Sequence, residues 1–317
     1  MLALASLLWA GNWVTGRALR GAFEPVALNF WRWLLASLIL APFALGGLKG
    51  KGPVLRRHAG ALVLLAVLGV SIFQSLVYLG LRTTETVNAV LLNSSLPLFI
   101  LACSWAIERE TATARQVAGV LVSTAGIAVI VARGELSRLL HLEFHAGDAW
   151  VLLAMPVWGV YSVLLKRKPA ELNATQFLFL LSTIGTILLA PAFALVSWQA
   201  PPRMPGAAEI AGVLYIAIAA SVLAFWFWNQ GVAIVGANTA GFTLHLLPLF
   251  GTVLAIVFLG EQFRAFHAVG FATILAGVVL ATRRQPSTPV PAPASRLLPG
   301  AAASASRAPG AGGSPPR

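Results

Sequence analysis

The sequence predicts an all-α membrane protein of ten transmembrane helices, arranged as two inverted five-helix repeats. The chain of 317 residues is 58% hydrophobic and only 10% charged, whereas an ordinary soluble domain is about 25% charged. Ten apolar segments follow one another, each close to the length that crosses a hydrocarbon core. Matching residues also recur in the two halves of the chain at a nearly constant spacing.

Each apolar segment is expected to be a helix, because backbone polar groups in lipid must be satisfied within the segment. The segments are continuously apolar and do not alternate as barrel strands do. The first one lacks the basic start of a signal peptide, and Asn12 interrupts it, so it is expected to be a span. The ten segments cover residues 1–19, 26–46, 59–80, 86–107, 115–133, 148–165, 175–198, 207–228, 237–258 and 266–282.

An internal repeat connects the two halves. The tetrapeptide LPLF at residues 96–99 returns at 247–250, 151 positions later, and Trp9 matches Trp158 at an offset of 149. Because each copy holds five spans, an odd number, the second copy must enter from the opposite face of the membrane. Inverted repeats are typical of secondary transporters, whose site lies near the midplane between the repeats. The predicted repeats are residues 1–133 and 148–282, joined by an outer connecting loop, 134–147.

The basic residues indicate an orientation. With the N-terminus inside, the inner loops and the start of the tail carry eleven Lys and Arg residues and the outer loops carry seven. Both termini are therefore expected in the cytoplasm, with a disordered tail at 283–317 that is rich in Pro, Ala, Ser and Gly. The net charge of +12 is scattered and forms no basic stripe, so no nucleic-acid partner is expected.

Residues from both halves carry a resemblance to a known family. The first span reads LLWAGNWV, Pro25 and Arg32 follow it seven residues apart, and further matches are Gly69, Tyr78, Ala89, Pro97, Glu110, Ala240, Pro248, Gly260 and Glu261. Over residues 1 to about 282 the chain resembles the EamA-type exporters of the drug/metabolite transporter superfamily. The resemblance implies a secondary transporter of the bacterial inner membrane that exports small metabolites, amino acids or related compounds above all.

Polar and aromatic side chains inside the spans are the candidates for a substrate cavity. Arg32 either extends outward to the interface or offers a carboxylate its guanidinium fork. His245 either titrates or is a satisfied structural histidine, and the other residues either line the path or hold helices together. The candidates are Trp9, Asn12, Arg32, Gln74, Tyr78, Asn88, Asn93, Trp158, Asn229, Thr243 and His245.

Three prolines and four glycines are expected to shape the helices. Pro97, Pro156 and Pro248 each leave the carbonyl four residues earlier without its donor, which indicates either an opened cavity wall or a packing kink. Two glycine pairs, each seven residues apart, share a helix face that allows close packing: Gly119 with Gly126, and Gly270 with Gly277. Two carboxylates at matching span ends are interpreted as structural, Glu110 and Glu261.

Other classes of function are less consistent with the sequence. It contains no HExxH, GxSxG or P-loop motif, so an enzyme is not predicted. The metal-like stretch HLEFHAGD at 141–148 is interpreted as a solvated loop, so no metal or cofactor is expected. Two alternatives remain, a non-transporting sensor or assembly subunit on the same fold and an exporter of drugs or other metabolites. The expected partners are a small molecule and the lipid bilayer, and the sequence does not distinguish a monomer from a homodimer.

Overall fold

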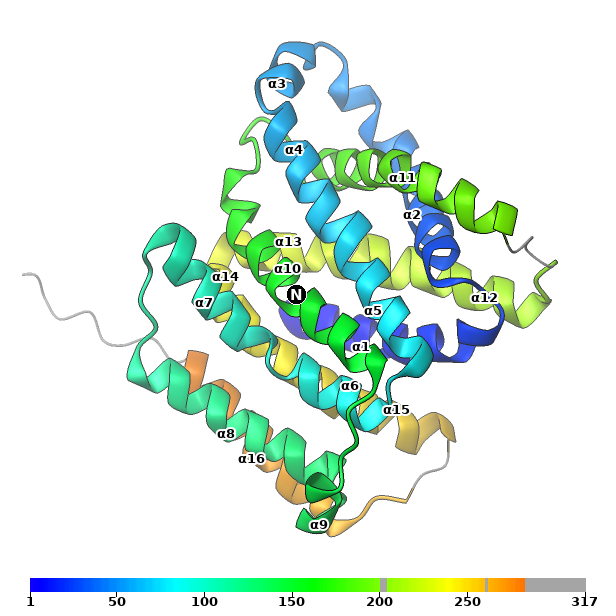
Figure 1. The fold of residues 1–317 in the computed structure, drawn as a ribbon. Helices are drawn as coiled ribbons and strands as arrows, with labels where there is room; N and C mark the ends of the chain where they lie inside the picture. The colour runs from blue at the N-terminus through cyan, green and yellow to red at the C-terminus, as the bar shows by residue number, and fades with distance from the viewer. Residues whose placement is uncertain (200–203, 260–261, 283–317) are drawn as a thin grey trace, which may run out of the picture. The chain divides into compact units, whose positions relative to one another are not determined.

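The computed structural model describes residues 1–199, 204–259 and 262–282, and within these ranges every regular element is helical. Each of the ten predicted segments folds as helix over its described residues (Figure 1). The prediction of an all-α membrane protein is therefore confirmed. The predicted tail, 283–317, and Glu261 lie outside the described residues.

The first half contains nine α-helices and three short helical turns. Thr113 caps α8 through a reciprocal pair of hydrogen bonds with Gln116, and Glu24 caps α2 by accepting from the backbone of Val26. The elements are α1 (Leu2–Ala18), η1 (Leu19–Gly21), α2 (Pro25–Ala44), η2 (Gly46–Leu48), α3 (Gly52–Arg57), α4 (Ala59–Ala66), η3 (Val67–Ile72), α5 (Phe73–Thr83), α6 (Thr86–Asn93), α7 (Leu96–Glu108), α8 (Ala114–Val131) and α9 (Leu136–Leu140).

The second half repeats the order of the main helices. Its elements are α10 (Ala146–Leu164), η4 (Leu165–Arg167), α11 (Ala174–Gln199), α12 (Ala207–Tyr215), η5 (Ile216–Leu223), α13 (Ala224–Val235), α14 (Ala237–Phe242), η6 (Thr243–His245), α15 (Leu246–Leu259) and α16 (Ala265–Thr282). Within the described part of the chain, nine helical segments are long and apolar enough to cross a bilayer. The first helix, α1, is also apolar and has 17 residues.

Irregularities of the helices also recur in the two halves. The third predicted span contains a π-helical stretch at Val67–Ile72, and the eighth contains one that starts 149 residues later, Ile216–Leu223. The fourth and ninth spans are each broken in two, and the second piece starts with a proline in its first turn, Pro97 in α7 and Pro248 in α15. Pro156 lies inside the continuous helix α10.

Matching helices of the two halves pack against each other in opposite directions. In Figure 1, α2 lies beside α11 and α8 lies beside α16. Phe30 near the start of α2 stacks on Phe193 near the end of α11, with ring centroids 4.1 Å apart. Gly47, just after α2, lies against Gln176 at the start of α11. Since residue numbers rise along one helix as they fall along its partner, the two helices are antiparallel.

The four predicted packing glycines lie in the contact between α8 and α16. A methyl group added to Gly126 would lie 2.8 Å from the carbonyl oxygen of Gly270, and one added to Gly119 would lie 2.7 Å from that of Gly277. The two backbones therefore approach too closely for any larger residue.

Candidate functional site

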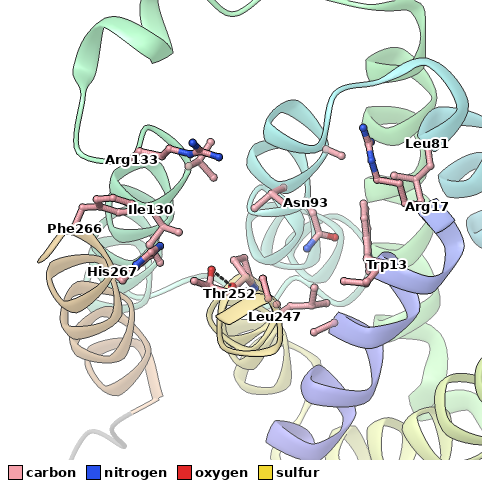
Figure 2. A pocket seen from close by; sticks show the side chains of 18 residues that line it. Trp13, Arg17, Leu81, Asn93, Ile130, Arg133, Leu247, Thr252, Phe266 and His267 are labelled. Atoms are coloured by element: carbon pink, nitrogen blue, oxygen red, sulfur yellow. Dashed lines mark hydrogen bonds between the residues drawn. The ribbon is translucent and has the colours of Figure 1, made fainter. Parts of the chain in front are cut away.

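A cavity of about 450 Å³, called here the large cavity, lies between α1 and α6 on one side and α8 and α16 on the other. Figure 2 shows Arg17 and Arg133 on opposite walls, with Thr252 of α15 between the walls. Most of its other lining is apolar: Ala10, Val14, Leu81, Ala89, Val90, Ile130, Val131, Leu247, Pro248, Gly251, Ala255 and Phe266. Its volume lies within the range of pockets for small organic molecules, about 300–1,000 Å³.

A second space of about 30 Å³, called here the small cavity, continues the large cavity toward the centre of the protein. The two share Trp13, Asn93 and Leu247. The rest of its lining is mainly aromatic and amide side chains: Trp9, Asn12, Phe73, Gln74, Leu96, Trp158, Phe225 and Leu244. This end has room for a group of only one or two water molecules' size.

The repeat-equivalent tryptophans meet at the small cavity. The rings of Trp9 and Trp158 lie 5.3 Å apart in an edge-to-face arrangement, and both contact Phe225 at 5.5 Å. The indole N–H of Trp9 donates to the carbonyl of Ala220 at 3.0 Å. Trp158 Nε1 is buried and has no hydrogen-bond partner.

Arg32 is fully buried and lines neither cavity. Its Nε donates to Ser221 Oγ at 2.7 Å, and its Nη1 donates to Tyr78 Oη at 2.9 Å and to Asn12 Oδ1 at 3.4 Å. Its Nη2 has no partner. The guanidinium therefore lies behind the wall of the small cavity, where Asn12 stands between it and the open space.

Five predicted cavity residues line the two cavities: Trp9, Asn12, Gln74, Asn93 and Trp158. The other six do not, and most of them bind neighbouring helices. Asn229 accepts from Tyr161 of α10 at 2.9 Å, whereas Thr243 donates within its own span, to the carbonyl of Ala240 at 2.7 Å. Asn88 donates to the Asp148 carboxylate at 2.7 Å.

His245 connects the two broken spans. Its Nε2 lies 2.8 Å from the carbonyl of Ser94, its counterpart 151 residues earlier, and its Nδ1 is hydrogen bonded to Ser123. With the proton on Nε2, the imidazole supplies the donor that the carbonyl at the break of the fourth span needs. The carbonyl of Thr243, at the other break, accepts from Ser6 at 2.9 Å. The side chains of His245 and Ser6 thus form hydrogen bonds with carbonyl groups at the two helix breaks.

Polar contacts also join helix ends outside the two cavities. Lys166 contacts Glu110 and lies 3.6 Å from Glu108, and Asn238 donates to Glu110 at 3.3 Å. The hydrogen bond from Lys166, helped by one from Ser104, holds the pKa of Glu110 below its ordinary value despite partial burial. These contacts join the end of α7, the end of α10 and the start of α14.

Several repeat equivalents of residues that line the large cavity are buried. An offset of 151 relates Gly251 to Ile100 and Thr252 to Leu101. Gly251 and Thr252 line the large cavity and are partly exposed, whereas Ile100 and Leu101 are buried. At an offset of 149, Arg17 corresponds to Lys166, which contacts Glu110. The contact between the two halves is therefore open at the large cavity, whereas the equivalent contact on the other side of the repeat is packed.

Comparison with known proteins identifies the family. The model of the EamA-like transporter family matches residues 1–132 and 145–283. The chain belongs to the EamA-like transporter family. It is therefore a multi-pass membrane transporter, which binds small molecules and lies in a lipid bilayer.

Relatives of this EamA-like transporter carry related names. An "uncharacterized transporter" of Archaeoglobus fulgidus is 31% identical over 90% of this chain and 97% of its own. A "probable terminal-alkyne amino-acid exporter" of Streptantibioticus cattleyicolor is 29% identical over 89% of this chain and 92% of its own. A solved crystal structure at 20% identity has the same fold, with a TM-score of 0.69 over 89% of this chain and 95% of that one.

Sequence reasoning missed several residues of the EamA-like transporter's cavity. Arg17 and Arg133 belong to the seven basic residues of the predicted outer loops, yet both line the large cavity. Asp148 lines neither cavity, but it is not solvated as the sequence predicts: it is 1% exposed and accepts from Thr84, from Asn88 and, at 2.8 Å, from the backbone of His145. Among the described residues, no three His, Cys, Asp or Glu side chains form a metal-binding group.

Proposed function

We propose that this protein exports small metabolites, amino acids or related compounds, across the bacterial inner membrane by alternating access. Its two halves act as inverted repeats, both termini lie in the cytoplasm, and the substrate binds in the large cavity between the halves. The antiparallel packing of α2 on α11 and of α8 on α16 supports the inverted arrangement.

One observation carries the proposal. The two regions that the internal repeat relates differ: one contains the large cavity and the other is packed. The large cavity occupies about 450 Å³ on one side, where Gly251 and Thr252 are partly exposed, while their repeat equivalents, Ile100 and Leu101, are buried. If each half adopted the arrangement that its counterpart has now, the large cavity would close and an equivalent cavity would open at the other end. This exchange would move a bound substrate from one face of the membrane to the other without a continuous pore.

Amino acids or related compounds are the proposed substrates for two reasons. A volume of about 450 Å³ suits a small organic molecule. The relative from Streptantibioticus cattleyicolor, named as a probable amino-acid exporter, aligns over 89% of the chain.

The proposal is tested by expression in a host that is sensitive to amino acids and their toxic analogues. We expect protection together with a lowered internal concentration of at least one compound. A cavity-filling variant, Gly251→Phe, should abolish protection, because a side chain there enters open space in the large cavity. The matched control is Gly60→Phe, at a helical glycine that also has open space but lies outside the cavity. Equal protection by both variants would exclude the large cavity as the path.

A further inference from the structure

We infer that the site recognises the carboxylate of its substrate and needs no ammonium group, so that organic acids without an amine are ligands as well. This inference rests on the proposed function, because it assumes that substrate binds in the two cavities. It is carried by the charges and the unpaired polar groups of their walls.

The charged side chains at the large cavity are cationic. Arg17 and Arg133 stand on opposite walls (Figure 2), and no Asp or Glu of the described residues lines either cavity. Within the described part of the chain, neither arginine is within 4.0 Å of a carboxylate oxygen, although the charge of Glu85 acts on Arg17 from farther away. Arg17 makes a long hydrogen bond, 3.4 Å, to the carbonyl of Thr84. Such a lining attracts anions and offers an ammonium group no carboxylate to contact.

The small cavity has unpaired donors. Trp158 Nε1 is buried without a partner, and Gln74 Nε2, whose side chain adjoins the Tyr78 hydroxyl, has no acceptor in good hydrogen-bond geometry. Both residues line this space, where Gln74 is 4% and Trp158 is 2% exposed. Arg32 Nη2, behind the wall, is a third buried donor without an acceptor. Burying an unpaired N–H is unfavourable, so a ligand that supplies acceptors would complete the site. A carboxylate fits, since it has two acceptor oxygens and no donor.

The dimensions of the cavities orient the ligand. The small cavity has room for a carboxylate but not for a ring, whereas the large cavity has room for an apolar body beside Leu247 and Val90. The competing arrangement is an ammonium group held against the faces of Trp9, Trp158 and Phe225. The unpaired N–H groups and the two arginines favour the carboxylate, because an ammonium group would leave these N–H groups without an acceptor.

The test compares three ligands that share one skeleton: phenylalanine, 3-phenylpropanoate, which lacks the amine, and 2-phenylethylamine, which lacks the carboxylate. Binding to the purified full-length protein is measured by calorimetry at low and at high salt. We expect the acid and phenylalanine to bind within about threefold of each other and the amine at least tenfold more weakly. The affinity of the acid should fall with salt. Binding of the amine as tight as that of the acid, or binding of none of the three, would overturn the inference.

Variants identify the recognising group. Gln74→Leu should weaken binding of the acid at least fivefold, and Gln74→Glu should reverse the preference toward the amine, because it replaces a donor by a carboxylate. The matched control is Ser162→Ala, which removes a buried unpaired hydroxyl that lines neither cavity, and it should bind all three ligands as the wild type does. An unchanged preference in a folded Gln74→Glu variant would also overturn the inference. Failure of the export screen, by contrast, would contradict the proposed function and leave this charge preference measurable.

Discussion

At the scale of single residues, a buried cation is held without a carboxylate. Arg32 is fully buried, and its hydrogen-bond partners are all neutral: Ser221, Tyr78 and Asn12. Removing a charge from water is costly, so each of these hydrogen bonds matters more than it would at a surface. The guanidinium also lies 5.2 Å from the Trp33 ring, which contributes a cation–π contact.

Removing the hydroxyl that Arg32 Nε contacts should destabilise the protein. We expect Ser221→Ala to cost about 1–3 kcal/mol, because it leaves a buried charged donor unpaired, and thermal unfolding in detergent would measure the loss. Ser182→Ala is the matched control, since this buried serine donates only within its own helix, to the carbonyl of Phe179. Equal melting temperatures for the two variants would show that the Arg32 contact contributes nothing.

The contact between Glu110 and Lys166 should make stability depend on pH. Because hydrogen bonding lowers the pKa of Glu110 in the folded protein, its stabilisation is present above the ordinary carboxyl pKa, about 4.3. It is lost as the pH falls through the lowered value. At pH 7 the wild type should melt above Glu110→Gln by an amount that corresponds to at most about 1 kcal/mol, since the pair is exposed. The difference should vanish near pH 3, and a difference that grew on acidification would contradict this assignment.

At the scale of elements, the pairs of matching helices differ in what brings them together. Glycines allow α8 and α16 to meet backbone to backbone, whereas the breaks in the fourth and ninth spans are joined through His245. The glycine spacing could be predicted from the sequence because a helix face repeats at a fixed interval. The partner of His245 could not, because two spans must first be brought together in space.

A larger residue in the glycine contact should separate α8 from α16. Gly126→Val adds its first carbon 2.8 Å from the carbonyl of Gly270, so the helices must shift at a cost of about 1–3 kcal/mol. Size-exclusion chromatography after heating would report the loss of folded protein. Gly60→Val provides the control, because nothing lies within 4 Å of an added carbon there. Indistinguishable heat resistance of the two variants would argue against tight packing of this helix pair.

At the scale of the whole molecule, the sequence was most informative where a pattern repeats. Apolar segments of membrane length predicted the helical class, and residues such as Pro97 and Pro248 predicted a repeat whose elements match in order. The cavity was harder to predict, because a sequence does not show which of two equivalent contacts is open. Arg17 and Lys166 are equivalent in sequence, yet one lines the large cavity and the other contacts Glu110.

The most direct test of alternating access is to measure how well a thiol reagent reaches two repeat-equivalent positions from each face of the membrane. In a Cys103→Ser background, single cysteines replace Thr252, which lines the large cavity, and Leu101, its buried repeat equivalent. Membrane-impermeant thiol reagents then label each variant from either face, with and without a transported substrate. Alternating access predicts that substrate lowers labelling of Thr252→Cys from one face while it raises labelling of Leu101→Cys from the other. Labelling that rises or falls at both positions together would contradict the account.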